Sequence, residues 1–195
     1  MLGWTKSRRR VVTLGDVGLL VLRASVGTLL AAHGAQKLFG AFGGHGVKGT
    51  ARWLESLGLT PGEPWSVLAG ITEFGGGLLM ACGLFSPLGE LGVIGSMTTA
   101  SGTAHRGKPI WATKGGAELP LTNIAIATSL IFAGPGALSL DGAFGSELPR
   151  WIALPGLAAV GAGVAFGIGT SKRVEAEEKR IAGAQLPMPD EARLA

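Results

Sequence analysis

Long apolar stretches with few charges limit what this 195-residue chain can fold into. Four of them lie at residues 17–38, 65–85, 88–104 and 118–134, and a fifth, glycine-rich stretch follows at residues 151–169. A hydrocarbon core about 30 Å thick is crossed by about 20 helical residues. Because only 15% of the residues are charged, there is too little polar surface for a soluble globule or a disordered chain. The sequence predicts an all-α membrane protein, a four-helix transmembrane bundle with a fifth C-terminal span.

The connection between the first two stretches, residues 39–64, has its own pattern. Trp53, Leu54 and Leu57 alternate with Lys48 and Arg52, which is typical of an amphipathic helix lying in the membrane interface. The chain then divides into a basic N-terminal segment (1–16), a four-helix membrane domain (17–141), an extra transmembrane helix (142–170) and a charged tail (171–195). Basic residues flank both ends of the spans, so the positive-inside rule does not decide the orientation.

Several classes of function are disfavoured by the residues present. The sole cysteine, Cys82, cannot form an intramolecular disulfide, a dithiol or a thiolate zinc site. The chain has no HExxH, no P-loop and no GxSxG motif, and we predict no metal site. Its basic residues are scattered between apolar stretches without a recognition motif, so we expect no nucleic-acid partner despite a pI of about 9.6.

Two charged residues lie well inside predicted spans. Arg23 is in the first span and Glu73 in the second, and such residues cost about 2.5 to 3.5 kcal/mol each unless they are paired or face the bundle interior. Their expected depths differ by only about 7 Å, within reach of two long side chains. The sequence predicts a structural ion pair between Arg23 and Glu73. A second interpretation gives Glu73 the role of exchanging a proton with a bound substrate.

A second group of ionisable residues is expected at the end of the bundle opposite the N-terminus. His33 and Lys37 share one face of the first span, and histidine both donates and accepts protons near neutral pH. Snorkelling of basic side chains at span ends is the plainer alternative. Haem ligation by His33 and His105 is disfavoured because basic residues flank both histidines. The residues expected to converge there are His33, Lys37, His105, Arg106 and Glu118.

Several short pieces occur in order along residues 20–141. They are Arg23, HGAQKLFG from His33 to Gly40, Glu73 in ITEFGGGLL followed by Gly83, His105, GGAELPL from Gly115 to Leu121, and GPGALSLD from Gly134 to Asp141. With these pieces the chain resembles the DoxX family of small bacterial membrane proteins. The resemblance implies a four-helix membrane fold and association with membrane redox systems. Related DoxD-type chains are linked to thiosulfate:quinone oxidoreduction, and some mycobacterial members to complexes that detoxify radicals and handle thiols.

The apolar stretches predict a multi-pass membrane protein, and the resemblance implies the bacterial cytoplasmic (inner) membrane. We expect the membrane subunit of a quinone-linked oxidoreductase or of an oxidative or thiol-stress complex, with a quinone as ligand. Its expected partners are the lipid bilayer, other subunits of the complex and further copies of itself. A non-catalytic scaffold and a small-solute transporter are the alternatives. In the leading interpretation Glu73 and Glu118 are the catalytic proton donors, and the quinone is bound by Arg23, His33, Lys37 and His105.

Overall fold

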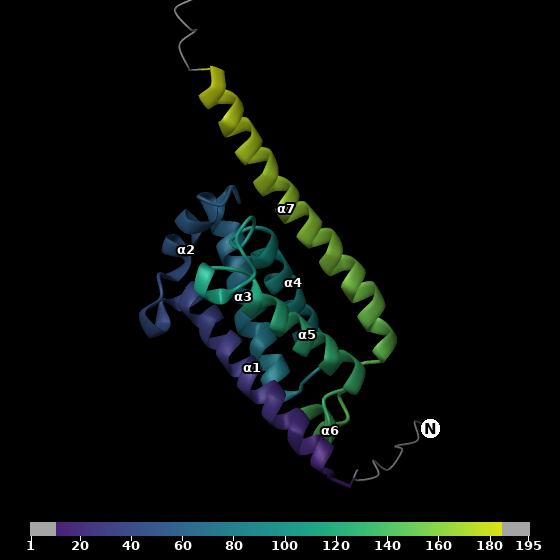
Figure 1. The fold of residues 1–195 in the computed structure, drawn as a ribbon. Helices are drawn as coiled ribbons and strands as arrows, with labels where there is room; N and C mark the ends of the chain where they lie inside the picture. Colours follow the sequence, from purple (N-terminus) through teal and green to yellow (C-terminus); the bar gives the residue numbers. More distant parts are fainter. Residues whose placement is uncertain (1–10, 185–195) are drawn as a thin grey trace, which may run out of the picture.

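The computed structural model describes residues 11–184 and is helical throughout, with no strand in that range. The predicted all-α fold is therefore confirmed. The seven α-helices are α1 (Leu14–Phe39), α2 (Gly46–Glu55), α3 (Gly62–Cys82), α4 (Leu88–Gly102), α5 (Glu118–Ala133), α6 (Leu140–Phe144) and α7 (Ala153–Ala184). In Figure 1, α1 and α7 begin at the lower end of the molecule, beside α6. The opposite, upper end carries α2 and the connection formed by residues 103–117.

The boundaries of α1 follow from its sequence. Thr13 and Asp16 form a capping box, in which the Asp16 carboxylate accepts from the Thr13 amide at 2.8 Å. The helix ends at Gly40, whose φ of 69° is left-handed and suits glycine. At 26 residues, α1 is about 39 Å long, enough to cross a bilayer. The helix begins three residues before the predicted span.

Helices α1 and α3 pack closely along faces made of glycine. A Cβ placed on Gly27 would lie 2.6 Å from both the Gly77 carbonyl oxygen and the Ala81 amide nitrogen. One placed on Gly34 would lie 2.2 Å from the Phe74 amide nitrogen. The two antiparallel backbones therefore touch, which only small residues permit. These contacts fix the register of α1 against α3.

Helix α4 is the central element of the bundle. It contacts α3, α5 and α7, and Val93 on it is fully buried. The 15 residues of α4 span about 23 Å, less than a full hydrocarbon core. The core around it consists of Leu30, Met80, Val93, Ile94, Met97, Ala127 and Leu130.

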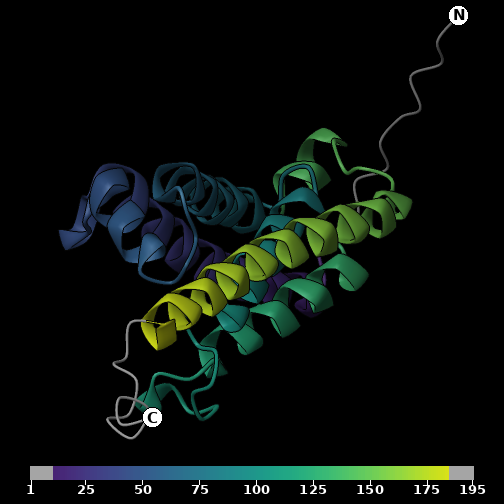
Figure 2. The ribbon, with the colours of Figure 1, turned by 90° about the horizontal axis from the view of Figure 1, so that it is seen from above.

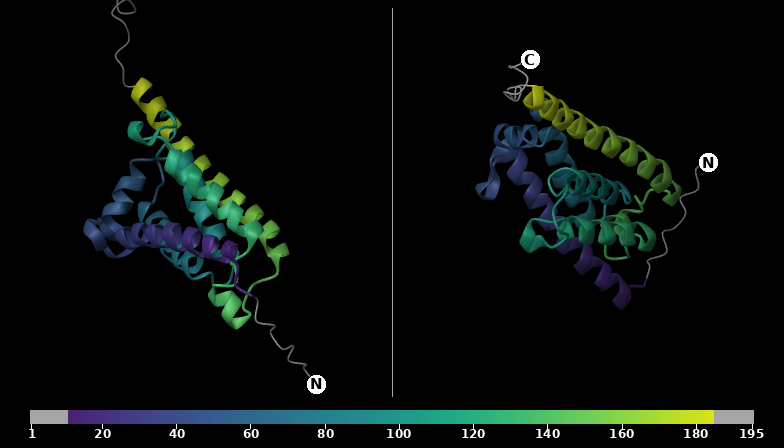
Figure 3. Two further views of the ribbon diagram at one scale, coloured as in Figure 1. Left: turned by 60° about the horizontal axis from the view of Figure 1, so that its bottom comes forward. Right: turned by 45° about the horizontal axis from the view of Figure 1, so that its top comes forward.

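Helix α7 is one continuous rod of 32 residues that lies along the outside of α4 (Figures 2 and 3). It does not break at residue 170, where the predicted span ends and the charged tail begins. Near that position the Ser171 hydroxyl donates to the Leu57 carbonyl at 2.5 Å, which joins α7 to the segment after α2. Residues 185–195 and the basic residues 6–10 lie outside the described range.

Three helical stretches within residues 11–184 are long and apolar enough to cross a membrane: α1, α3 and Arg150–Gly183, which includes all of α7 except Ala184. Helix α5 is apolar but shorter. The predicted interfacial segment does contain a helix, α2, which buries Ala51 and Leu54 against the bundle and exposes Arg52. The chain is thus a helical membrane protein.

Candidate functional site

A cavity of about 1150 Å³ lies between the helices. It is larger than a typical small-molecule site, which has about 300 to 1000 Å³. Every helix except α6 contributes to its wall, and the wall is mainly apolar. Representative apolar lining residues are Leu30, Leu57, Leu68, Leu91, Val160 and Val164.

An ion pair between α1 and α3 forms one polar part of the cavity wall. The Lys37 ammonium donates to the Glu73 carboxylate, and the two side chains are 21% and 7% exposed. Because the Glu73 carboxylate is largely buried, its charge depends on the Lys37 ammonium for compensation. His33, one helical turn from Lys37, also lines the cavity but is exposed. The predicted grouping of His33, Lys37 and Glu73 is therefore present.

His105 reaches the same cavity from the 103–117 connection. Its Nδ1 lies 2.7 Å from the Gly115 carbonyl oxygen. A carbonyl only accepts, so Nδ1 carries the hydrogen, and in the neutral ring Nε2 is a free acceptor. His105 thus adds a proton-accepting nitrogen to the site.

Polar residues of α3, α4 and α5 that sequence reasoning missed also line the cavity. The hydroxyls of Thr72, Thr99 and Thr103 donate to carbonyls of α3 and α4, which leaves their lone pairs as acceptors. Asn123 on α5 makes only a weak contact, 3.7 Å from its amide nitrogen to the Met97 sulfur. Its amide is consequently available to a ligand. An asparagine in an apolar span was the signal that could have found it.

Arg23 is not part of the cavity wall, and the predicted ion pair with Glu73 is wrong. Its guanidinium is buried and donates to the carbonyls of Ala81 and Leu138 near the lower end. The glycine contacts place Glu73 level with Lys37, and 14 residues, or about 21 Å of helix, separate Arg23 from Lys37. Arg23 therefore joins α1 to the end of α3 and to the segment before α6.

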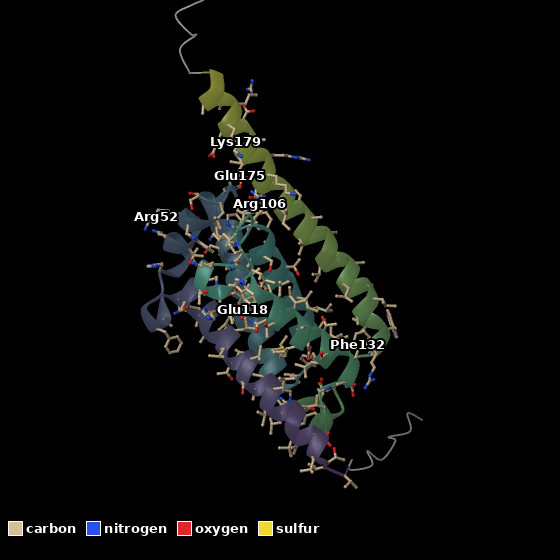
Figure 4. All side chains as sticks on the ribbon, viewed as in Figure 1. Arg52, Arg106, Glu118, Phe132, Glu175 and Lys179 are labelled. Atoms are coloured by element: carbon tan, nitrogen blue, oxygen red, sulfur yellow. The ribbon has the colours of Figure 1, made fainter. Side chains whose placement is uncertain are left out.

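Glu118 also lies outside the cavity wall. It is exposed, and its carboxylate accepts from the Ala112 amide at 2.8 Å, which closes the connection before α5. Arg106, expected at the same level, instead pairs with Glu175 on α7 (Figure 4). Both residues thus lie toward the predicted end of the bundle, but only His33, Lys37 and His105 of the predicted group line the cavity.

A second polar cluster lies at the lower end, and its two acids were not singled out in the sequence. Asp141 accepts from the amides of Phe85 and Ser86, each at 2.9 Å. Glu90 is 2% exposed and accepts from the Ser86 hydroxyl at 3.3 Å. Among residues 11–184, no group of three or more His, Cys, Asp or Glu side chains is arranged to hold a metal ion.

The DoxX family model matches residues 18–106. This part of the chain belongs to the DoxX family. It covers most of α1, all of α2 to α4 and His105, so His33, Lys37 and Glu73 are all in the DoxX region. The cavity walls from α5 and α7 lie beyond it. No curated protein and no solved structure matches the chain.

Proposed function

We propose that this DoxX protein binds a lipid-soluble quinone in the cavity, as the membrane subunit of a redox complex in the bacterial cytoplasmic membrane. The observation that carries the proposal is the Lys37–Glu73 ion pair in the wall of a large, mainly apolar cavity. A quinone combines a flat ring with two carbonyl acceptors and an apolar tail. The cavity offers charged and polar partners for the carbonyls and apolar walls for the tail.

The polar groups suit the two needs of such a ligand. Lys37 and the Asn123 amide supply donors for a carbonyl oxygen. Glu73 and the free Nε2 of His105 exchange protons, which must follow electrons onto a quinone. These roles support Glu73, Lys37 and His105 as site residues, with His33 at the exposed margin. Arg23 and Glu118 have no place in this ligand site.

The role of a subunit, and not of a complete enzyme, is supported by the redox motifs that the sequence lacks. One cysteine provides no dithiol, and no glycine-rich dinucleotide motif accompanies the spans. Electrons for the quinone therefore come, in this proposal, from a partner protein. The charged turns of α7 beyond Thr170 and the exposed face of α2 are surfaces that a partner can reach.

Quinone binding is directly measurable because Trp53 and Trp65 line the cavity. Purified protein in mild detergent is titrated with a decyl-substituted benzoquinone while tryptophan fluorescence is followed. We expect saturable quenching, and a dissociation constant at least tenfold higher, about 1.4 kcal/mol, in Asn123→Leu and in the double variant Lys37→Met, Glu73→Gln. Glu118→Gln, which changes a carboxylate outside the cavity, is the matched control.

Equal affinity in all four proteins would remove the site assignment. Absence of saturable quenching in the wild type would refute quinone binding altogether. In that case, a specific protein recovered with this chain from native membranes would favour the scaffold function instead.

A further inference from the structure

Glu90 is a buried carboxylate with one oxygen left unpartnered. It lies in the first turn of α4 and is 2% exposed. Its Oε1 accepts from the Ser86 hydroxyl at 3.3 Å, whereas Oε2 has no hydrogen-bond partner within residues 11–184. An ionised carboxylate oxygen left without a donor in a protein interior is costly. A protonated acid lowers that cost.

The charges around Glu90 favour the same form. Arg23 of α1 and Asp141 of α6 both interact with it electrostatically. Asp141 is an acceptor for two amides and for the Ser146 hydroxyl, as expected of an ionised carboxylate. Arg23 and Asp141 then cancel, and an ionised Glu90 would add an uncompensated negative charge.

The charged groups that act on Glu90 are Asp141 and Arg23, and Asp16 of α1 accepts from the Ala137 amide. Helix α5 has Glu118, at its upper end, and α7 has no charged residue before Lys172. On α3, Glu73 is engaged by Lys37, and Cys82 lies at the lower end beside Arg23. Two residues near the lower surface, Glu147 and Arg150, pair with each other.

Glu90 is also next to the cavity. The residues that follow it, Leu91 and Gly92, line the cavity wall. A Cβ on Gly92 would lie 3.3 Å from the Thr72 carbonyl oxygen, and one on Gly89 would lie 2.6 Å from the Met80 amide nitrogen. Glu90 therefore lies between these two levels of α3, nearer to Met80 than to Thr72, and its backbone is about 6 Å along the helix from the level of Glu73. On its other side, Ser86 belongs to the connection at the lower end.

We propose that Glu90 is a proton-binding group that holds a proton at neutral pH and passes it between the lower end and the cavity. The step moves a proton only: it arrives from water at the lower end beside Ser86, resides on the Glu90 carboxyl, and leaves to the cavity ligand as another proton replaces it. The protonated state of Glu90 stands on the cluster alone. The use of that proton rests on the proposed ligand function.

Infrared absorption of the full-length protein in H₂O and D₂O tests the protonated state. We expect the carbonyl band of a protonated carboxylic acid, shifted to lower frequency in D₂O, in the wild type near neutral pH. The band should disappear in Glu90→Gln and remain in Glu63→Gln, which changes an exposed acid of α3. A wild type without this band, or Glu90→Gln that retains it, overturns the proposal.

Two further measurements separate the proton site from folding and from ligand binding. Glutamine imitates a protonated glutamate, so Glu90→Gln should melt at or above the wild-type temperature, whereas a large loss of stability would indicate an ionised Glu90 and contradict the proposal. Glu90→Asp keeps a carboxyl group at this position, so it should retain the protonated-acid band at an altered frequency.

Addition of decyl-benzoquinone should shift the Glu90 band. Quinone binding with an unchanged band would refute the link to the cavity. Absence of quinone binding with the band present would refute the proposed function and leave the proton site standing.

Discussion

Gly34 of α1 lies directly against Phe74 of α3, so closely that a Cβ on Gly34 would be 2.2 Å from the Phe74 amide nitrogen and 2.6 Å from its Cα. Lys37 follows Gly34 by three residues, and Glu73 precedes Phe74. The contact that brings the backbones together therefore also brings the ammonium to the carboxylate. Packing and the polar site share one interface.

Gly34→Ala should destabilise the protein by about 1 to 3 kcal/mol, because the added methyl group meets backbone atoms that cannot move aside. The measurement is the free energy of unfolding in detergent. Gly18→Ala is the matched control on the same helix, since a Cβ there has no atom within 4 Å. Equal stability of the two variants would show that α1 and α3 are farther apart than described.

Removing one member of the Lys37–Glu73 pair should cost more than removing both charges. Lys37→Met leaves a buried carboxylate without its partner, a loss of about 3 to 5 kcal/mol. Adding Glu73→Gln should restore most of that stability. The thermodynamic cycle of the two single variants and the double variant measures the coupling. Additive effects would argue against the pair.

Arg23→Lys should destabilise the protein by at least about 2 kcal/mol although the charge is kept. The guanidinium reaches two carbonyls, those of Ala81 and Leu138, and a single ammonium cannot occupy both directions. Thermal unfolding compares this variant with Arg52→Lys on the exposed face of α2, which should be neutral. Similar melting temperatures for both would refute the role of Arg23 as a tie between segments.

Labelling of single cysteines should show that α5 crosses the membrane. In a Cys82→Ser background, Thr113→Cys lies in the upper connection and Ala143→Cys lies in α6 at the lower end, and both positions are exposed. A membrane-impermeant maleimide applied to intact cells should label only one of them. Labelling of both from the same side would contradict a transmembrane α5.

The apolar stretches predicted the helices well because a run of residues long enough to cross a bilayer can be counted directly in the sequence. The close approach of α1 and α3 also has a sequence signal, since Gly27 and Gly34 stand on one helix and Gly70 and Gly77 on the other. The sequence did not predict which residue pairs with each buried charge. Choosing between Lys37 and Arg23 as the partner of Glu73 requires the register of α1 against α3, which is set by contacts between residues about 40 to 55 positions apart.

The remaining errors have local causes. Glu118 lies at the predicted upper end, but the connection before α5 folds back, so the Ala112 amide donates to the Glu118 carboxylate outside the cavity. Glu90 was hidden in a span judged only by its overall polarity. The reach of α7 past Thr170 depends on Ser171 and on Glu175 meeting the rest of the molecule, which neither periodicity nor charge reveals.

The unbroken course of α7 has a mechanical consequence. At about 48 Å the rod is longer than the hydrocarbon layer is thick, so its charged turns project into water while Val160 and Phe166 still form cavity wall. No loop lies between these two parts to absorb a displacement. If the projecting turns tilt, Val160 and Phe166 at the cavity wall must move with them.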